Sequence, residues 1–302
     1  MAEGTDHISV CVCTYKRPHL LERLLDRLSI QATGRSFTYS IVVVDNDSFH
    51  SAKSTVSLFC GRNPIDIAYV SEPEQNIALA RNRAIQNARG NYLAFIDDDE
   101  CPVEDWLLNL FTTCKVHNAD GVLGPVRPRY EVDPPEWIVK GGLHDRKEFP
   151  TGEFLRDSRY MRTGNVLIAM SMFEGAEFPF DPRFGSTGGE DTDFFRRMMR
   201  KGHVFVWCNE APVYENVPPE RMSRSYFLKR ALLRGVVSAR SQPFNVLGIS
   251  KSFVAFILYV FSLPFLQLAG HHLLMKYLVK SCDHIGKLLA TFGIDVVEKR
   301  TW

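Results

Sequence analysis

In the first part of the chain, short apolar runs alternate with segments of helical spacing. Residues 8–14, 40–44 and 65–70 are short and rich in β-branched side chains, which predicts buried strands. Between the first two runs, residues 18–28 place five leucines on one helical face, after a proline that suits a first helical turn. This order predicts a β-α-β unit with parallel strands.

Two further elements extend the alternation. Residues 77–88 have helical spacing and are followed by Gly90, and residues 92–96 form an apolar run that ends in acids. We therefore predict an α/β fold, with a mostly parallel sheet that is covered by helices on both faces and connected by right-handed crossovers. In such a fold the loops after the strands line one crevice.

The second part of the chain is less regular. Residues 124–157 are rich in proline, glycine and charge, which predicts a long functional loop. After it we expect strands at 164–170 and 203–207, a glycine-rich loop at 181–189, and a helix at 190–201.

Beyond residue 218 the pattern changes again. Residues 221–240 mix six basic side chains with aromatic residues and leucines, and residues 252–269 carry no charge. Residues 271–292 predict a helix of mixed basic and apolar character. A charge-free run near the length of a membrane span, preceded by a basic helix, favours contact with a bilayer.

A buried helical hairpin is the alternative for this C-terminal region, because Ser262, Pro264 and Gln267 interrupt the apolar run. Whether the run spans a bilayer or lies in it stays open, since the mixed polarity that follows suits either arrangement. The change in character predicts two domains, a catalytic domain at 1–220 and a membrane-associated helical region at 221–302.

Composition adds limits to this picture. Hydrophobic residues make up 45% of the chain and charged residues 24%, which is ordinary for a folded protein. The 36 basic and 35 acidic residues give a net charge of +1, so nothing favours a nucleic-acid-binding class. Seven scattered cysteines argue against a disulfide framework. Because residues 1–7 are polar, we expect no cleaved signal peptide and a cytosolic N-terminal part.

Three consecutive carboxylates, those of Asp97, Asp98 and Asp99, follow the apolar run at 92–96. Clustered carboxylates repel one another and are costly to hold together unless a cation neutralises them. Their position at the carboxyl end of a buried strand, where α/β sheets bind ligands, predicts a divalent metal site. The alternative is an acidic helix N-terminus, because aspartate favours caps and Pro102 could begin a helix.

Two other acidic segments have similar positions. Asp45 follows a predicted strand and could accept a hydrogen bond from the imide N–H of a pyrimidine base, although an Asx turn explains that pattern alone better. Glu190, Asp191 and Asp193 open a predicted helix, whose N-terminus stabilises an ionised carboxylate as a proton acceptor. Capping explains one of these three acids.

Basic, amide and aromatic side chains supply further candidates. Arg81 and Arg83 lie on the helix before the acidic strand, and Arg162 and Asn165 lie just after the long loop. Such residues could bind phosphate oxygens or sugar hydroxyls, although arginines on helices are more often solvated. Trp137 could stack on a ligand ring or anchor local packing.

In their order and spacing, these motifs resemble the family 2 glycosyltransferases of the GT-A fold, over roughly residues 8–240. The matching motifs are Val10-Cys11-Val12-Cys13-Thr14-Tyr15-Lys16-Arg17-Pro18, Val43-Val44-Asp45-Asn46-Asp47-Ser48, Ala80-Arg81-Asn82, Phe95-Ile96-Asp97-Asp98-Asp99-Glu100 and Gly189-Glu190-Asp191. The downstream Glu215-Asn216-Val217-Pro218 and Arg221 are most similar to the branch that contains succinoglycan-type exopolysaccharide glycosyltransferases.

The resemblance implies an inverting hexosyltransferase that uses a nucleotide-diphosphate sugar, usually UDP-linked, with Mg²⁺ or Mn²⁺. It implies that Thr14 and Asp45 contact the nucleoside, Arg81 the base or diphosphate, Asp97 and Asp98 the ribose and metal region, and Asp99 the metal, with Asp191 as general base. We expect acceptor contacts or support from Glu190, Arg162, Asn165 and Trp137.

Two departures from the family pattern bear on function. Many relatives carry a late histidine as a further metal or phosphate ligand, where this chain has Tyr214-Glu215-Asn216. Processive members carry Gln-x-x-Arg-Trp near the membrane, and the segment Tyr226-Phe227-Leu228-Lys229-Arg230-Ala231 lacks both Gln and Trp. We therefore expect one sugar to be added per saccharide or lipid-linked acceptor, at the cytoplasmic face of a membrane.

Two alternative functions remain at this point. A sugar-nucleotide nucleotidyltransferase has a related core, but it would need a glycine-rich loop after the first strand, and residues 15–18 contain no glycine. A non-catalytic sugar-nucleotide-binding membrane scaffold is disfavoured because Asp99 and Asp191 are both present.

Overall fold

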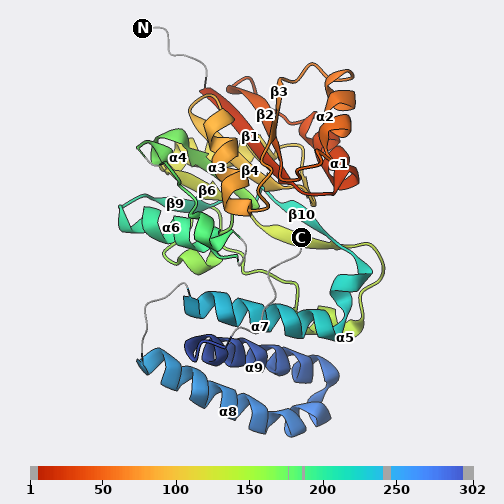
Figure 1. Cartoon of the computed structure of the whole chain (residues 1–302), viewed down its shortest axis with the longest axis vertical. Coiled ribbons are helices and arrows are strands. Elements are labelled where there is room, and N and C mark those ends of the chain that lie inside the picture. The colour runs from red at the N-terminus through yellow and green to blue at the C-terminus, as the bar shows by residue number, and fades with distance from the viewer. Residues whose placement is uncertain (1–5, 176, 186–187, 241–245, 295–302) are drawn as a thin grey trace. The chain divides into compact units, whose positions relative to one another are not determined.

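The computed structural model describes residues 6–175, 177–185, 188–240 and 246–294. Within them the chain forms two compact units, one of residues 6–127 and 146–215 and one of residues 128–145 and 216–294 (Figure 1). Residues 1–5, part of the predicted polar N-terminal segment, and residues 186–187 of the predicted glycine-rich loop lie outside the described residues.

The first unit is built on a seven-stranded sheet with strand order β3-β2-β1-β4-β8-β6-β9. The strands are β1 (Asp6–Thr14), β2 (Phe37–Asp45), β3 (Ile67–Ser71), β4 (Tyr92–Asp97), β6 (Gly121–Leu123), β8 (Asn165–Ala169) and β9 (Phe205–Trp207). β1 pairs in parallel with β2 and β4, β2 with β3, and β6 with β9. Only β8 among these runs antiparallel to its neighbours. The predicted mostly parallel sheet is therefore confirmed.

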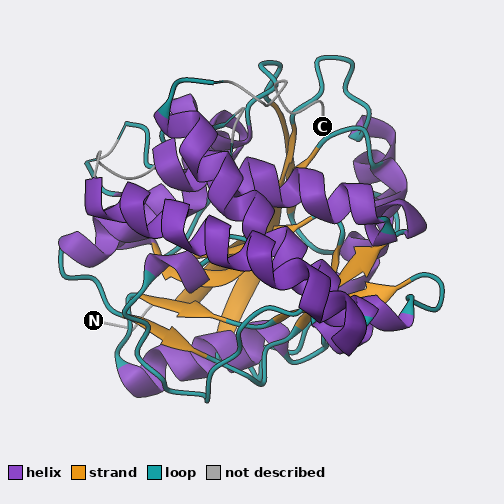
Figure 2. Ribbon diagram, turned by 90° about the horizontal axis from the view of Figure 1, so that it is seen from below, coloured by secondary structure: helices purple, strands orange, loops and turns teal. Residues whose placement is uncertain are grey.

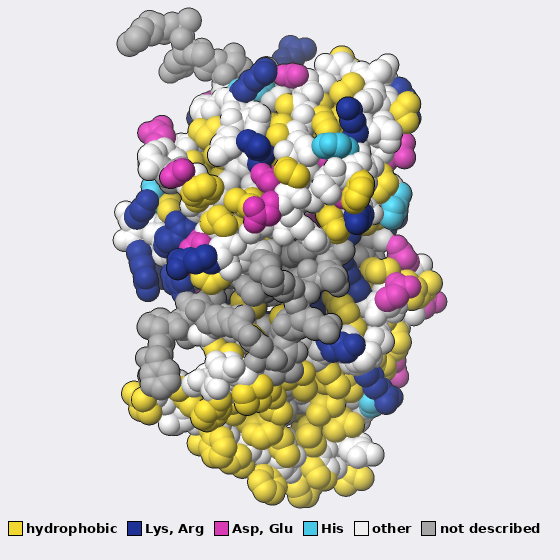
Figure 3. All heavy atoms as spheres, viewed as in Figure 1, with side chains coloured by type: hydrophobic (Ala, Val, Ile, Leu, Met, Phe, Trp, Pro, Cys, Tyr) yellow, Lys and Arg dark blue, Asp and Glu magenta, His cyan; other side chains and the backbone are white. Residues whose placement is uncertain are grey.

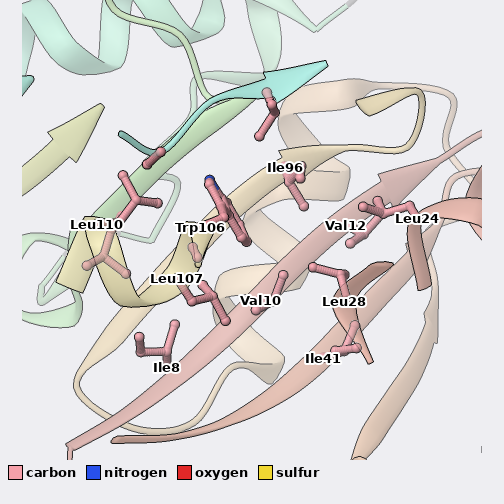
Figure 4. Packing of buried hydrophobic residues seen from close by; sticks show 14 of the residues in the cluster. Ile8, Val10, Val12, Leu24, Leu28, Ile41, Ile96, Trp106, Leu107 and Leu110 are labelled. Carbon is pink, nitrogen blue, oxygen red and sulfur yellow. The ribbon is translucent and has the colours of Figure 1, made fainter. Parts of the chain in front are cut away.

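Helices cover both faces of this sheet. They are α1 (Pro18–Leu28), α2 (Lys53–Cys60), α3 (Ile77–Asn87), α4 (Trp106–His117) and α6 (Glu190–Arg200). Side chains of α1, α2 and α4 enter one core cluster, and side chains of α3 and α6 enter another. Alternate residues of β1 point to opposite faces of the sheet. Ile8, Val10 and Val12 belong to the first cluster (Figure 4), and Cys11 belongs to the second.

Helix α1 shows how the sequence directs this packing. Four of its leucines, Leu21, Leu24, Leu25 and Leu28, are buried at helical spacing. Burial of each such side chain contributes roughly 1.5–3 kcal/mol. In Figure 4, Leu24 and Leu28 lie over β1. The predicted helix at 18–28 therefore forms because its apolar face has a sheet to cover.

A second sheet of three strands has the order β5-β10-β7. These are β5 (Glu100–Pro102), β7 (Val126–Tyr130) and β10 (Val213–Val217). Pro102 thus ends a strand, and α4 begins only at Trp106, so the three aspartates precede a strand and not the predicted alternative of a helix cap.

The segment 124–157 contains β7 and the short helix α5 (Glu136–Gly141), so the prediction of a long loop there was wrong. Strand β7 has the sequence VRPRY, with a proline and two arginines, which hides a strand from a hydrophobicity pattern. It lies at the edge of its sheet, where a proline need not donate a hydrogen bond.

Three long helices dominate the second unit: α7 (Arg224–Arg240), α8 (Val246–Ala269) and α9 (His271–Thr291), seen in purple in Figure 2. Helix α9 lies between the other two (Figure 1). Gly286 of α9 lies so close to α7 that a Cβ atom there would be 2.2 Å from the carbonyl oxygen of Leu232. The two backbones therefore touch at a point where only glycine fits.

Candidate functional site

The register of the main sheet brings three predicted residues to one edge. Thr14 is paired with Asp45 across β1 and β2, and Cys13 with Asp97 across β1 and β4. Because all three strands are parallel, Thr14, Asp45 and Asp97 lie at their carboxyl ends. This is the edge at which an open α/β sheet binds ligands.

Asp98 is buried and held by two other residues. The Thr14 hydroxyl donates a hydrogen bond to its Oδ2 at 2.7 Å, and a guanidinium nitrogen of Arg17 lies 3.3 Å from its Oδ1. The same nitrogen lies 3.5 Å from Oδ2 of Asp99. Burial raises the pKa of Asp98 to about 7, against the lowering effect of Arg17, and the charge of Asp99 adds to the rise.

Asp97 differs from Asp98 because 48% of its side chain is exposed. Desolvation by the surrounding protein and the negative charges of Asp99 and Glu215 raise its pKa to about 6, although Arg81 acts against this. Glu100 lies beneath, fully buried, and accepts a hydrogen bond at 3.0 Å from the backbone N–H of Asp97. Burial raises the pKa of Glu100 well above its usual range.

The backbone of Gly164 lies close to the carboxylates of Glu100 and Asp97. A Cβ atom at this position would lie 2.7 Å from Oε1 of Glu100 and 3.0 Å from Oδ2 of Asp97. Any side chain at position 164 would therefore displace one of the acids.

Arg81 connects the acids of β4 to those of α6. One guanidinium nitrogen lies 3.7 Å from Oδ1 of Asp97, and another pairs with Oε1 of Glu190. The guanidinium also lies over the ring of Phe180, 5.8 Å from its centroid. Among the described residues, Oε2 of Glu190 is buried and has no hydrogen-bond partner. A buried polar atom without a partner needs an explanation, and a bound ligand group would be one.

Asp191 is the second residue of α6, in the first turn, where the helix dipole favours an ionised carboxylate. Its Oδ1 accepts a hydrogen bond at 2.6 Å from the backbone N–H of Thr192, and its Oδ2 lies 3.9 Å from Nε of Arg162. Arg162 also donates to the Thr192 hydroxyl at 3.3 Å. Asp193, in contrast, is held by Arg196 and Arg197 of its own helix.

Two other predicted residues are enclosed by local partners. Asp45 is fully buried and accepts hydrogen bonds from the backbone of Asp47 and Ala52 and from the Tyr69 hydroxyl. Its bond from Asp47 is the Asx turn that the sequence also suggested. Asn165 accepts a hydrogen bond from the indole of Trp106 at 2.8 Å, and its amide donates to two backbone carbonyls. These three hydrogen bonds fix the side chain of Asn165, and its role in the site stays a prediction.

Trp137 does not belong to the unit that carries the acids. It lies in α5 of the second unit, and its ring packs edge-to-face against Phe227 and His271, with centroids 5.6 Å apart in each case. This is the packing arrangement that the sequence left open as an alternative to sugar stacking.

The structure adds residues that the sequence analysis did not single out. Arg17 pairs with two of the three aspartates, and Arg146 pairs with Glu215, which lies opposite Glu100 in the small sheet. Glu100 follows the three aspartates directly, so its position was a signal. Arg146 has no comparable signal, because its partner comes from a strand 69 residues later.

In the part of the chain that the structure describes, no three His, Cys, Asp or Glu side chains form a group that could hold a metal ion. The donor chemistry nevertheless suits a hard divalent cation, because the cluster offers carboxylate oxygens. The pKa values of Asp97 and Asp98 are both raised in part by the charge of Asp99, and a bound cation would offset this excess charge. Mg²⁺ commonly takes only one or two protein carboxylates together with substrate phosphates.

Comparisons with known proteins bear on this site. The model of the family described as "Glycosyl transferase family 2" matches residues 9–174. The succinoglycan biosynthesis protein ExoM of Rhizobium meliloti (strain 1021) is 36% identical over 244 residues, which cover 80% of this chain and 76% of that protein. The hyaluronan synthase of Pasteurella multocida is 23% identical, over 70% of this chain and 25% of its own length.

Solved structures show the same fold. The crystal structure of S. aureus TarS 1-349 in complex with UDP-GlcNAc has a TM-score of 0.54 to this chain at 17% identity, and it covers 78% of this chain and 71% of the TarS chain. The predicted GT-A fold is thereby confirmed.

Proposed function

The chain belongs to glycosyl transferase family 2 and is a glycosyltransferase; from this premise we propose that it moves one sugar from a nucleotide-diphosphate donor to a saccharide or lipid-linked acceptor, with inversion at the anomeric carbon. The observation that carries the proposal is the position of Arg81, which contacts Asp97 on one side and Glu190 on the other. Asp97, which we assign to the donor, and Glu190, which we assign to the acceptor, therefore contact a single guanidinium.

On the donor side, we assign nucleoside and diphosphate contacts to Thr14, Asp45, Arg81, Asp97 and Asp98. Four of these residues lie at, or directly after, the carboxyl ends of adjacent strands, and Arg81 reaches the same edge from α3. A UDP-linked donor is supported by the UDP-GlcNAc bound to TarS, which has this fold. The cationic side chains of Arg17 and Arg81 suit a diphosphate.

A divalent cation, Mg²⁺ or Mn²⁺, completes the proposed donor site. Asp99 is the residue that would hold it, because its carboxylate is next to those of Asp97 and Asp98 and its charge raises the pKa of both. When bound, the cation supplies charge stabilisation to the leaving diphosphate.

For the transfer step, we propose that Asp191 is the general base. The acceptor hydroxyl oxygen attacks the anomeric carbon, the bond from that carbon to the diphosphate oxygen breaks, and the electron pair leaves with the diphosphate. The hydroxyl proton passes to the Asp191 carboxylate, which the N-terminus of α6 favours in its ionised form. Attack from the side opposite the leaving group inverts the configuration.

We assign the acceptor side to residues near Asp191. We propose that Arg162, whose Nε lies 3.9 Å from Asp191, binds an acceptor hydroxyl. We propose the same for Glu190, whose Oε2 has no hydrogen-bond partner among the described residues. Asn165 supports the site through the carbonyls that it binds. The contact of Trp137 with an acceptor sugar stays a prediction from the sequence, and within the second unit its ring contacts Phe227 and His271.

The cellular role that we propose is polysaccharide synthesis at the cytoplasmic face of a membrane. The named relatives include a succinoglycan biosynthesis protein and a hyaluronan synthase. Within the described residues, α8 is the one helix long and apolar enough to cross a bilayer, and only 6% of its apolar window is buried. A buried core helix would not leave that surface exposed.

The test compares Asp191→Asn with Asp193→Asn. Wild-type protein is incubated with UDP-sugars, Mn²⁺ and a panel of saccharide and lipid-linked acceptors, and released UDP and the anomeric configuration of the product are measured. We expect a β-linked product from an α-linked donor, and a loss of about 10²–10⁴ in turnover for Asp191→Asn. Asp193→Asn, which changes a residue bound to its own helix, should retain most activity. Binding of UDP-sugar without any transfer or hydrolysis would favour the non-catalytic alternative.

A further inference from the structure

Helix α8 carries a continuous apolar stripe on its exposed side. The exposed residues Val254, Leu258, Phe261, Phe265 and Leu268 follow one another at intervals of four and three, with Phe253 beside them. Figure 3 shows hydrophobic side chains gathered over this helix at the bottom of the view. No acid lies on α8, and its one charged residue, Lys251, is exposed near the start of the stripe.

The opposite side of α8 packs on α9 through aromatic and polar side chains. Tyr259, near the middle of α8, lies 5.5 Å from Tyr277 and 5.6 Å from His284 between ring centroids. The ammonium group of Lys280 lies 5.7 Å from the centroid of the Tyr259 ring. The midpoint of the apolar helix is therefore in contact with a cation and an imidazole.

Helix α9 is in turn fixed to α7. Arg234 of α7 and Asp283 of α9 form a two-point ion pair, with Nε 2.8 Å from Oδ1. Gly235 and Gly286 allow the backbones to approach, because a Cβ at either position would lie 2.2 Å from a carbonyl oxygen of the other helix. Helix α9 thus cannot follow α8 into a bilayer without carrying this ion pair along.

These contacts decide between two arrangements of α8. Its 24 residues measure about 36 Å, enough for a hydrocarbon layer of about 30 Å. If α8 crossed the layer while packed on α9, Tyr259 would lie near the midplane and would bring Lys280 and His284 with it, where ionisable groups are costly. If α8 lies along the surface, its stripe enters the acyl region and α9 stays on the aqueous side.

The excess of basic residues in the C-terminal region favours binding to an anionic lipid surface. Residues 221–294 carry one acid, Asp283, and ten basic residues: Arg221, Arg224, Lys229, Arg230, Arg234, Arg240, Lys251, Lys276, Lys280 and Lys287. Asp283 is already paired with Arg234. Basic residues beside an apolar stripe bind membranes that contain anionic lipids.

We infer that α8 is an interfacial helix, which lies in the plane of an anionic bilayer with its exposed stripe toward the acyl chains and does not cross it. This inference rests on the membrane association proposed above and specifies its geometry. The partner is a lipid surface, and a second copy of the chain on the stripe is an outcome that the tests below detect.

The geometry is tested by labelling full-length protein that was added to the outside of sealed vesicles containing phosphatidylglycerol. Lys251→Cys and Lys276→Cys place thiols near the two ends of α8, at exposed positions on α8 and α9. A membrane-impermeant maleimide should label both before the vesicles are lysed, above the level that wild-type protein gives through native cysteines such as the exposed Cys60. Labelling of Lys276→Cys only after lysis would mean that α8 crosses the bilayer and would overturn the inference.

Binding is tested with a matched pair of substitutions. Leu258 in the stripe and Leu58 in α2 are 63% and 66% exposed. Leu258→Glu should reduce co-flotation with anionic vesicles at least tenfold and Leu58→Glu less than twofold, and replacing phosphatidylglycerol with phosphatidylcholine should weaken wild-type binding. Equal binding by both variants would overturn the inference.

Two further outcomes separate this inference from the proposed enzyme function. Wild-type protein that releases UDP from a UDP-sugar but floats with no vesicle would refute the membrane surface and leave glycosyl transfer standing. Sedimentation of wild type as a dimer that Leu258→Glu separates, without vesicle binding by either, would assign the stripe to a second copy and would also refute it.

Discussion

The guanidinium of Arg81 pairs with the carboxylate of Glu190 in the interior of the first unit, where each side chain is only 8% exposed. Arg81 lies in α3 and Glu190 lies in α6, and the two residues are 109 positions apart in sequence. A buried ion pair has a high cost when one partner is lost, because the other charge stays behind without compensation. The pair therefore fixes the N-terminus of α6, and with it Asp191, relative to the acids of β4.

Replacement of Arg81 by methionine should lower the free energy of unfolding by about 3 kcal/mol, as for other broken buried pairs. Arg83→Met is the control on the same helix, since its side chain is 44% exposed and lies 3.8 Å from Glu72, and a change below about 1 kcal/mol is expected. Urea denaturation measures both. Arg81→Met with Glu190→Leu should recover part of the loss, and equal effects of the two single arginine variants would contradict this account.

Gly164→Ala should disrupt the acid cluster without a large effect on the rest of the fold. The added methyl group would approach Glu100 and Asp97 more closely than van der Waals contact allows. We expect UDP binding in the presence of Mn²⁺ to weaken at least tenfold, measured by calorimetry. Gly61→Ala is the control, because its Cβ would lie 3.6 Å from the nearest atom, in ordinary contact. Unchanged binding by Gly164→Ala would contradict the assignment of Asp97 to the donor site.

The contribution of Asp97 and Asp98 to the free energy of unfolding should fall as pH rises from about 4 to 7 in the absence of divalent cations. The pKa values of Asp97 and Asp98 are about 6 and about 7 in the folded protein, above the usual value of 3.8. In this range the folded protein binds protons that the unfolded chain has lost, so the free energy of unfolding decreases with pH. Asp98→Asn should flatten the slope. Urea titrations at several pH values would show this, and an identical slope in Asp98→Asn would contradict it.

Gly286→Ala should loosen the second unit. Its methyl group would overlap the carbonyl oxygen of Leu232, and backbone atoms cannot move aside as a flexible side chain can. Overpacking of this kind typically costs about 1–3 kcal/mol. Hydrogen exchange should rise in α7 and α9 and stay unchanged in the first unit. Unaltered exchange in α9 would contradict the close helix contact that supports the interfacial placement of α8.

Much of the fold could be predicted because its local patterns agree with its packing. The leucines of α1 repeat at helical spacing and are buried on one face, and β4 has an apolar run that ends where its acids begin. The reversed direction of β8 could not be predicted, since strand direction depends on which neighbours pair, and this is not visible in a run such as NVLIA.

The candidate site was predictable to a similar degree. Three aspartates after a strand and three acids at a helix start are local signals, and both motifs lie at Arg81 in the structure. The ion pairs from Arg17 to Asp98 and from Arg146 to Glu215 join residues more than 65 positions apart, so no spacing rule reveals them. The proposed contacts of Asp45 and Asp191 with substrate stay predictions.

The most direct measurement is a calorimetric titration of the purified full chain with UDP in the presence of Mn²⁺, repeated with chelator and with Asp99→Ala. The account predicts binding that is lost both when the metal is removed and when Asp99 is replaced, because the cation and its carboxylate act together on the diphosphate. Absence of UDP binding by protein shown to be folded, or equal binding by Asp99→Ala, would contradict the proposed donor site.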